Sequence, residues 1–181
     1  MSSWKDLLKI ESKKANIPVL KEGQSLEVVF TLIFRSIADQ IQKNWDFILL
    51  EEDPEGIHQL RVGLRRLRSA LKLFRPLVDT PSLREFDSQA RDIGRFLAEI
   101  RDIDVFLSDI IGPVYKSRND DLSFGALKKY LENLRAVSLS NVREKLKDNR
   151  WSNFKLELAL LPEIMMFSGK NEALKSNNKP I

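Results

Sequence analysis

Six basic side chains lie within one 20-residue stretch of the chain that contains no acidic residue. Residues 57–76 hold five arginines and one lysine, although the formal net charge of the whole chain is only +4. The positive charge is therefore concentrated in one element, which is evidence about a binding partner rather than about the fold. A guanidinium group binds phosphate oxygens through two parallel hydrogen bonds, so this stretch favours the binding of a phosphate-rich polyanion.

Helical periodicity places most of these charges on one face. An α-helix advances by about 100° per residue, which puts one histidine and four cations inside an arc of about 80°, along about 21 Å of axis. The leucines of the same stretch fall on a separate arc and predict the buried face. We call the cationic arc the basic ridge; its members are His58, Arg61, Arg65, Arg68 and Lys72. Arg66 falls off the ridge, and we expect it to have a peripheral or structural role.

The spacing of the ridge makes its charges repel one another. Arg61 with Arg65 and Arg68 with Lys72 are like-charged i, i+4 pairs, and each such pair costs a helix about 0.2–0.5 kcal/mol. A helix face that is merely solvated is expected to mix positive and negative side chains, and long basic side chains also cover apolar surface. Because no acidic residue offsets the repulsion, we interpret the ridge as a binding site, with a solvated face as the alternative.

A second group of cations follows in the next predicted helix, away from its apolar stripe. Its members are Arg91, Arg95 and Arg101. Asp102 and Asp104 are nearby candidates for metal ligands or acid/base groups, but two carboxylates without further ligands make a weak metal site. Ion pairing within the helix is the simpler interpretation, and it predicts the pairs Asp92 with Arg95 and Arg101 with Asp104.

The composition excludes several kinds of chemistry. The chain has no cysteine and a single histidine, which excludes disulfides, thiolate zinc sites and multi-histidine metal sites. It has no Gly-x-x-x-x-Gly-Lys-Ser/Thr loop and no nucleophile with a nearby base. We therefore expect a protein that is not an enzyme and holds neither a metal nor a cofactor. A phosphohydrolase or kinase ranks last among the functions considered.

No segment of the sequence predicts a membrane span or an export signal. Apolar runs stay below the 18 residues that a span requires, and the N-terminus lacks a signal-type apolar stretch. We expect a cytoplasmic protein that does not contact a membrane.

Helical periodicity accounts for the elements that must position these side chains. The 181 residues suit one domain, the 7 glycines and 7 prolines favour long helices, and no alternating pattern predicts a strand. The sequence predicts an all-α protein, most simply an antiparallel bundle of about five helices with short connections. The predicted helices run from the Ser25 cap to about 50, from the Asp53-Pro54 start to 74 or 75, from 81–82 to just before Gly112-Pro113, from 123 to 149, and from about 152 to 168–169.

The expected organisation has three parts. Residues 1–22 form an N-terminal arm or weak helix, 23–168 the helical domain, and 169–181 a polar, frayed tail. A loop is expected over residues 116–121.

Two motifs of this chain resemble those of the CHAD (conserved histidine α-helical domain) family. The first runs from His58 to Phe74 and reads HQLRVGLRRLRSALKLF. The second runs from Arg101 to Val105, at the distance that the family shows. The similarity extends from about residue 23 to about residue 161. Two motifs in the right order make the resemblance more specific than either motif alone.

The resemblance implies a helical domain that binds inorganic polyphosphate through basic residues lining a groove or pore, without catalysis. Carried over by position, these residues are His58, Arg61, Arg65, Arg68, Lys72, Arg91, Arg95 and Arg101. His58 has two interpretations: it donates to phosphate, or it only orients a neighbouring side chain.

The chain departs from the family in length. The family domain usually has two related helical halves, and the second half carries its own histidine-containing basic helix. This chain has one histidine and is expected to correspond to one half and part of the second. It is then either a truncated form or a subunit that associates with a second copy to complete a two-sided channel; if it is neither, the ridge is open and binding should be weaker.

Nucleic acid is the alternative polyanion. Sites for single strands interleave aromatic side chains with cations so that bases can stack, and the ridge holds no aromatic residue. A ridge without such platforms suits a ligand made of phosphates alone. The backbone of duplex DNA or RNA stays open as an alternative ligand, as does a helical interaction or scaffold role.

Overall fold

A computed structural model of the chain describes residues 11–76, 79–117 and 122–176, and every regular element in these ranges is helical. The all-α fold predicted from the sequence is confirmed. The elements are α2 (Leu26–Leu50), α3 (Pro54–Phe74), α4 (Pro81–Val105), the π-helix η1 (Phe106–Ile111), α5 (Gly112–Ser117), α6 (Leu122–Lys147) and α7 (Asn149–Ser176).

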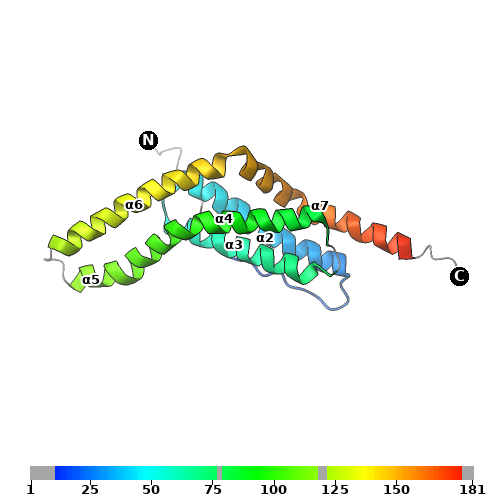
Figure 1. Cartoon of the computed structure of the whole chain (residues 1–181). Coiled ribbons are helices and arrows are strands. Elements are labelled where there is room, and N and C mark those ends of the chain that lie inside the picture. The colour runs from blue at the N-terminus through cyan, green and yellow to red at the C-terminus, as the bar shows by residue number, and fades with distance from the viewer. Residues whose placement is uncertain (1–10, 77–78, 118–121, 177–181) are drawn as a thin grey trace, which may run out of the picture.

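Three helices form the centre of the molecule. Helix α3 packs between α2 and α4, while α7 covers α2 and α6 crosses α4 (Figure 1). The stripe of leucines predicted to be buried in α3 is buried, with Leu60 and Leu67 fully inaccessible. Each fully buried aliphatic side chain contributes about 1.5–3 kcal/mol to folding. The hydrophobic core therefore fixes which face of α3 is left for its cations.

The helix starts predicted from capping residues are confirmed. The Ser25 hydroxyl accepts a hydrogen bond from the Val28 amide. The Asp53 carboxylate accepts one from the Glu55 amide at 2.8 Å, with Pro54 in the first turn of α3. These side chains satisfy amide groups that have no partner inside the helix.

The predicted end of the third helix is wrong. The helical structure does not end before Gly112. It continues from α4 through the π-helix η1 into α5, so that Lys116 and Ser117 are helical. Pro113 is the second residue of α5 and directly follows η1, where i→i+5 hydrogen bonds such as that from the Gly112 amide to the Leu107 carbonyl replace the regular i→i+4 pattern. The rest of the loop predicted over 116–121 lies outside the described residues.

The predicted bounds of the last helix are also wrong. The Asp148 carboxylate accepts a hydrogen bond from the Arg150 amide at 2.8 Å, and α7 starts at Asn149 rather than near residue 152. It continues past Gly169 to Ser176. One glycine costs a helix only about 1 kcal/mol, which is too little to end it. The three-part division of the chain stays a prediction.

Residues 11–20 of the N-terminal segment pack against the helices without being helical themselves. Residues 11–20 have no regular secondary structure, and residues 1–10 lie outside the described range. The Lys13 amide donates to the Asn44 side chain of α2, which donates back to the Lys13 carbonyl.

None of the helices in the described part of the chain combines the length and the apolarity that crossing a membrane requires.

Candidate functional site

A cleft of about 720 Å³ lies along the surface between α3 and α4. Both helices contribute to its lining, and all eight side chains singled out from the sequence are among the lining residues. They are His58, Arg61, Arg65, Arg68, Lys72, Arg91, Arg95 and Arg101. The packing of α3 on α4 therefore brings the basic ridge and the second group of cations to one place.

The charge of the cleft is positive throughout. Its lining contains seven arginine or lysine side chains and, among the described residues, no aspartate or glutamate. Besides His58, the remaining contributors are small or aliphatic, such as Gly94 and Val62, and no phenylalanine, tyrosine or tryptophan of the described residues lines the cleft. A concave surface lined by one sign of charge raises the local concentration of oppositely charged ligands.

Two arginines of the ridge are held in place by α4. Arg61 donates through Nη1 to the Gly94 backbone carbonyl at 2.6 Å, so it is positioned by a neutral acceptor and keeps its full charge. Arg68 donates through Nε to the Asp87 carboxylate at 2.9 Å. Arg68 is therefore the ridge cation that a carboxylate already accompanies.

Most of the other cations of the cleft form no ion pair with a described residue. In the described parts of the chain, no carboxylate oxygen lies within ion-pairing distance of Arg65, Lys72, Arg91 or Arg101. The predicted pair of Arg95 with Asp92 is present at 3.9 Å. Asp92 also lies 3.4 Å from Arg150 of α7, which divides its charge between two guanidinium groups.

The predicted pair of Arg101 with Asp104 is wrong. Asp104 instead accepts a hydrogen bond from Arg135 of α6 at 2.5 Å, and its side chain is only 1% exposed. Arg135 also donates to the Glu52 carbonyl at 2.7 Å. The sequence gives no local signal for this contact because 31 positions separate the partners. The contact between Asp104 and Arg135 therefore links α4 to α6, and Arg101 lines the cleft without Asp104 as a counter-charge.

No metal site accompanies these carboxylates in the described residues. Asp102 is exposed, and no three histidine, aspartate or glutamate side chains of the described part of the chain gather as metal ligands would.

Arg66 has the structural role expected from its position off the ridge. It donates to the Gln40 side chain of α2 and to the Asn16 carbonyl of the N-terminal segment. Its partial burial lowers the pKa of the guanidinium from the ordinary value, because the charged form loses hydration. Arg66 thus fastens residues 11–20 to the helices on the side away from the cleft.

Comparison with known proteins identifies the family. The family model of the CHAD domain matches residues 32–179, which include both basic motifs, and the chain belongs to the CHAD domain family. It is similar to the crystal structure of the CHAD domain from the plant Ricinus communis, with 27% sequence identity and a TM-score of 0.72. The match covers 88% of this chain and 52% of the plant chain, so this chain spans about half the length of its structural relative. No curated protein matches the sequence.

We expect Asp104 to act in folding rather than in binding. Replacing it by alanine leaves the Arg135 guanidinium, which is 14% exposed, without its counter-charge, and the cost is up to about 3 kcal/mol of unfolding free energy. Urea denaturation followed by circular dichroism measures this loss. The control is Asp102→Ala, an exposed neighbour whose effect is expected to stay within about 0.5 kcal/mol. Equal stability of the two variants would contradict a stabilising role for the contact between Asp104 and Arg135.

Proposed function

We propose that this chain binds inorganic polyphosphate in the cleft between α3 and α4 and does so without catalysis. The observation that carries the proposal is the composition of the cleft: seven cations from two helices, with no carboxylate and no aromatic side chain among its described lining residues. Membership of a family whose domain is known in general to bind polyphosphate supports the same ligand.

The arrangement of the cations suits a linear ligand. The ridge residues of α3 extend along about 21 Å of helix axis, and the arginines of α4 form the facing row. A chain that carries charge on every unit can contact both rows along its length. Arginine predominates in the cleft, and its guanidinium group matches two phosphate oxygens at once.

The backbone of duplex nucleic acid is the second candidate ligand. It also presents repeated phosphates, and contacts to it need no aromatic platform. A duplex, however, carries its phosphates on a convex surface, whereas the cations here line a concave one. The cleft therefore favours a single thin chain of phosphates over a duplex.

Removing two ridge arginines is expected to abolish most of the binding. Arg61→Ala with Arg65→Ala removes one positioned and one unpaired guanidinium, each able to make a charge-assisted hydrogen bond worth about 1.5 kcal/mol or more. Polyphosphate affinity should fall by about 100-fold in isothermal titration, with an unchanged circular dichroism spectrum. The matched control is Lys43→Ala with Lys155→Ala, which removes the same charge from side chains paired with Asp39 and Asp46 outside the cleft. A similar loss in both double variants would show that only net charge matters.

Competition separates the two candidate ligands. We expect long-chain polyphosphate to displace duplex DNA at matched phosphate concentration, in fluorescence anisotropy measured at several salt concentrations. The logarithm of the affinity should fall linearly with the logarithm of salt concentration, because each neutralised phosphate releases counterions. Duplex DNA bound tightly at physiological salt and not displaced by polyphosphate would overturn the proposal.

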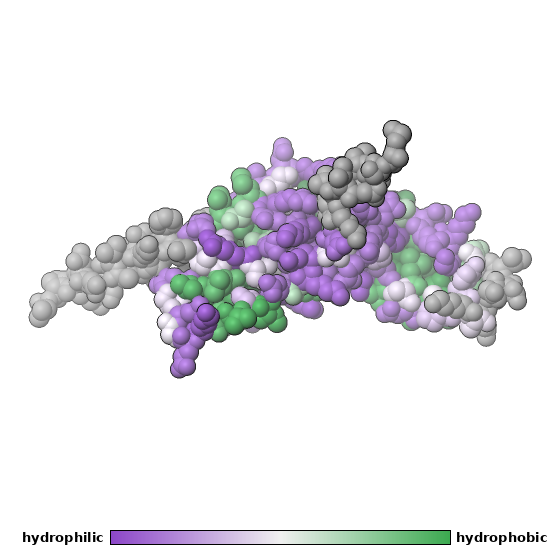
Figure 2. All heavy atoms as spheres, turned by 180° about the vertical axis from the view of Figure 1, so that it is seen from behind, coloured by the Kyte–Doolittle hydropathy of each residue, from purple (hydrophilic) through white to green (hydrophobic). Residues whose placement is uncertain are grey.

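We also propose that two copies associate to complete a two-sided channel. All lining residues of the cleft that the structure describes come from α3 and α4, which leaves its opposite side open to a second copy. Large apolar side chains of η1 and α6 are at least 40% exposed; they are Phe106, Ile110, Leu127 and Tyr130. Seen from behind, apolar atoms gather toward both ends of the molecule, while the middle is mostly hydrophilic (Figure 2).

This association predicts a change in mass. Light scattering is expected to give twice the 20.9 kDa of one chain when tripolyphosphate is present, because the ligand adds counter-charge between two basic surfaces. Replacing Ile110 and Tyr130 by serine should restore the mass of a single chain. A single-chain mass for the unaltered protein, with and without ligand, would contradict it.

A further inference from the structure

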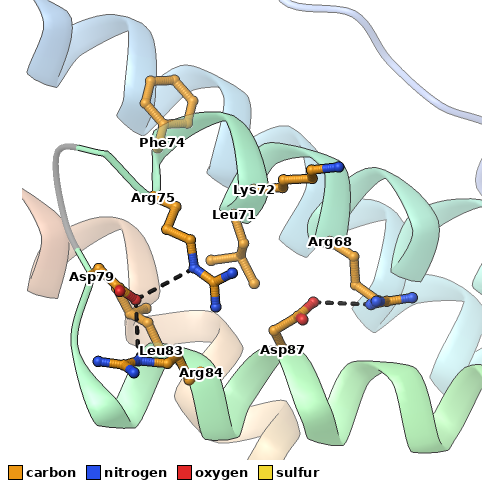
Figure 3. Close-up of a pocket in the computed structure, with 9 residues that line it drawn as sticks. All are labelled: Arg68, Leu71, Lys72, Phe74, Arg75, Asp79, Leu83, Arg84 and Asp87. Atoms are coloured by element: carbon orange, nitrogen blue, oxygen red, sulfur yellow. Dashed lines mark hydrogen bonds and ion pairs between the residues drawn. The ribbon is translucent and has the colours of Figure 1, made fainter.

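The cationic surface does not end with the cleft. A second pocket of about 220 Å³ adjoins it toward the connection between α3 and α4, and the two share Arg68 and Lys72 (Figure 3). The second pocket adds Arg75, directly after α3, and Arg84 of α4. The row of basic side chains along α3 therefore continues beyond the ridge.

The second pocket differs from the cleft because it contains carboxylates. Asp87 lies 2.9 Å from Arg68. One oxygen of Asp79 lies 3.4 Å from Arg75 and 3.2 Å from Arg84, so it joins the two helices across their connection (Figure 3). Three of the four cations that line this pocket thus have an internal counter-charge. The cleft has seven cations and no carboxylate among its described lining residues, whereas the pocket next to it has four cations and two carboxylates.

We infer that Asp79 and Asp87 are internal counter-anions. They prevent bound polyphosphate from extending along α3 beyond Lys72, and they lower the affinity of the chain for polyphosphate. This inference rests on the proposed function and adds to it the residues that set how far the ligand extends. The two carboxylates occupy positions on Arg68, Arg75 and Arg84 that phosphate groups of a longer ligand would otherwise take. They also repel a phosphate chain that lies in the adjoining cleft.

The exposure of these pairs makes the effect measurable. Asp87 is 28% exposed and its partner Arg68 is 41% exposed, and the pairs of Asp79 are more exposed still. Ion pairs in such surroundings are weak. Losing one therefore costs little folding stability, while the freed guanidinium gains a phosphate partner.

Asp87 is the better residue for the test. Asp79 directly precedes Thr80, the N-cap of α4, so its charge also stabilises the start of that helix. Asp87 lies within α4 and faces α3 through Arg68. Asparagine at position 87 keeps an oxygen that can accept from Arg68 Nε and removes only the charge.

The experiment compares Asp87→Asn with the unaltered chain and with Asp46→Asn in titrations with long-chain polyphosphate. The control removes one equal charge from a carboxylate that pairs with Lys155 outside the cleft. We expect Asp87→Asn to bind about two- to fivefold more tightly than either, the factor that corresponds to one exposed ion pair. Its affinity should also depend more steeply on salt concentration, because an additional phosphate is neutralised. Asp79→Asn is the second variant and should change the affinity in the same direction.

The possible failures are distinguishable. Equal affinities of Asp87→Asn and Asp46→Asn would overturn the inference, and so would weaker binding by Asp87→Asn, which would make Asp87 a positioning residue for Arg68. Neither result touches the proposed function, which fails only if the unaltered chain does not bind polyphosphate. Circular dichroism checks that each variant is folded. If Asp87→Asn is not folded, Asp79→Asn replaces it as the test variant.

Discussion

The burial of one face of α3 is the constraint on which the rest of the structure depends. Its leucines pack into the core formed with α2 and α4, and this packing fixes the rotation of the helix about its axis. The basic ridge then lies along the groove beside α4, on a face of α3 that the core leaves open. Like charges one turn apart oppose helix formation by a few tenths of a kcal/mol per pair, whereas the buried side chains of the same helix contribute several times more. The core therefore holds the cations together against their repulsion.

The positions of the carboxylates decide where positive charge remains. Asp104 turns away from Arg101 and is buried against Arg135, and Asp92 is drawn partly toward Arg150. Both arrangements use residues of the C-terminal helices, although no described side chain of α6 or α7 lines the cleft. The two later helices thus shape the electrostatics of a site that they do not line, by engaging acidic side chains of α4 in other contacts.

The sequence predicted the local features of this molecule well and the distant contacts poorly. Periodicity placed α2, α3 and the start of α4, because the helical repeat is a local property. That the basic residues of two helices line one groove was implied only by the resemblance to the CHAD family, and it is the packing of α3 on α4 that brings all eight to one cleft. The predicted helix end before Gly112 was wrong because the chain continues through the π-helix η1 into α5, which contains Pro113. The predicted helix end near Gly169 was wrong because one glycine does not end a helix. The prediction also failed for Asp104, since its partner lies 31 positions away. The pair of Arg68 with Asp87 joins two different helices, and no rule of spacing within one helix reveals it.

The contact between Arg61 and the Gly94 carbonyl orders a guanidinium group without neutralising its charge. A guanidinium group held by a carboxylate is ordered, but its charge is partly neutralised. One that contacts only water keeps its full charge but is mobile. A backbone carbonyl orders the side chain and leaves its formal charge intact. An incoming anion then meets a group whose rotamer is already selected, so less side-chain entropy is lost when the complex forms. Such a cation gives a charged groove a fixed point of attachment, around which more mobile lysine and arginine side chains can adjust to an irregular ligand.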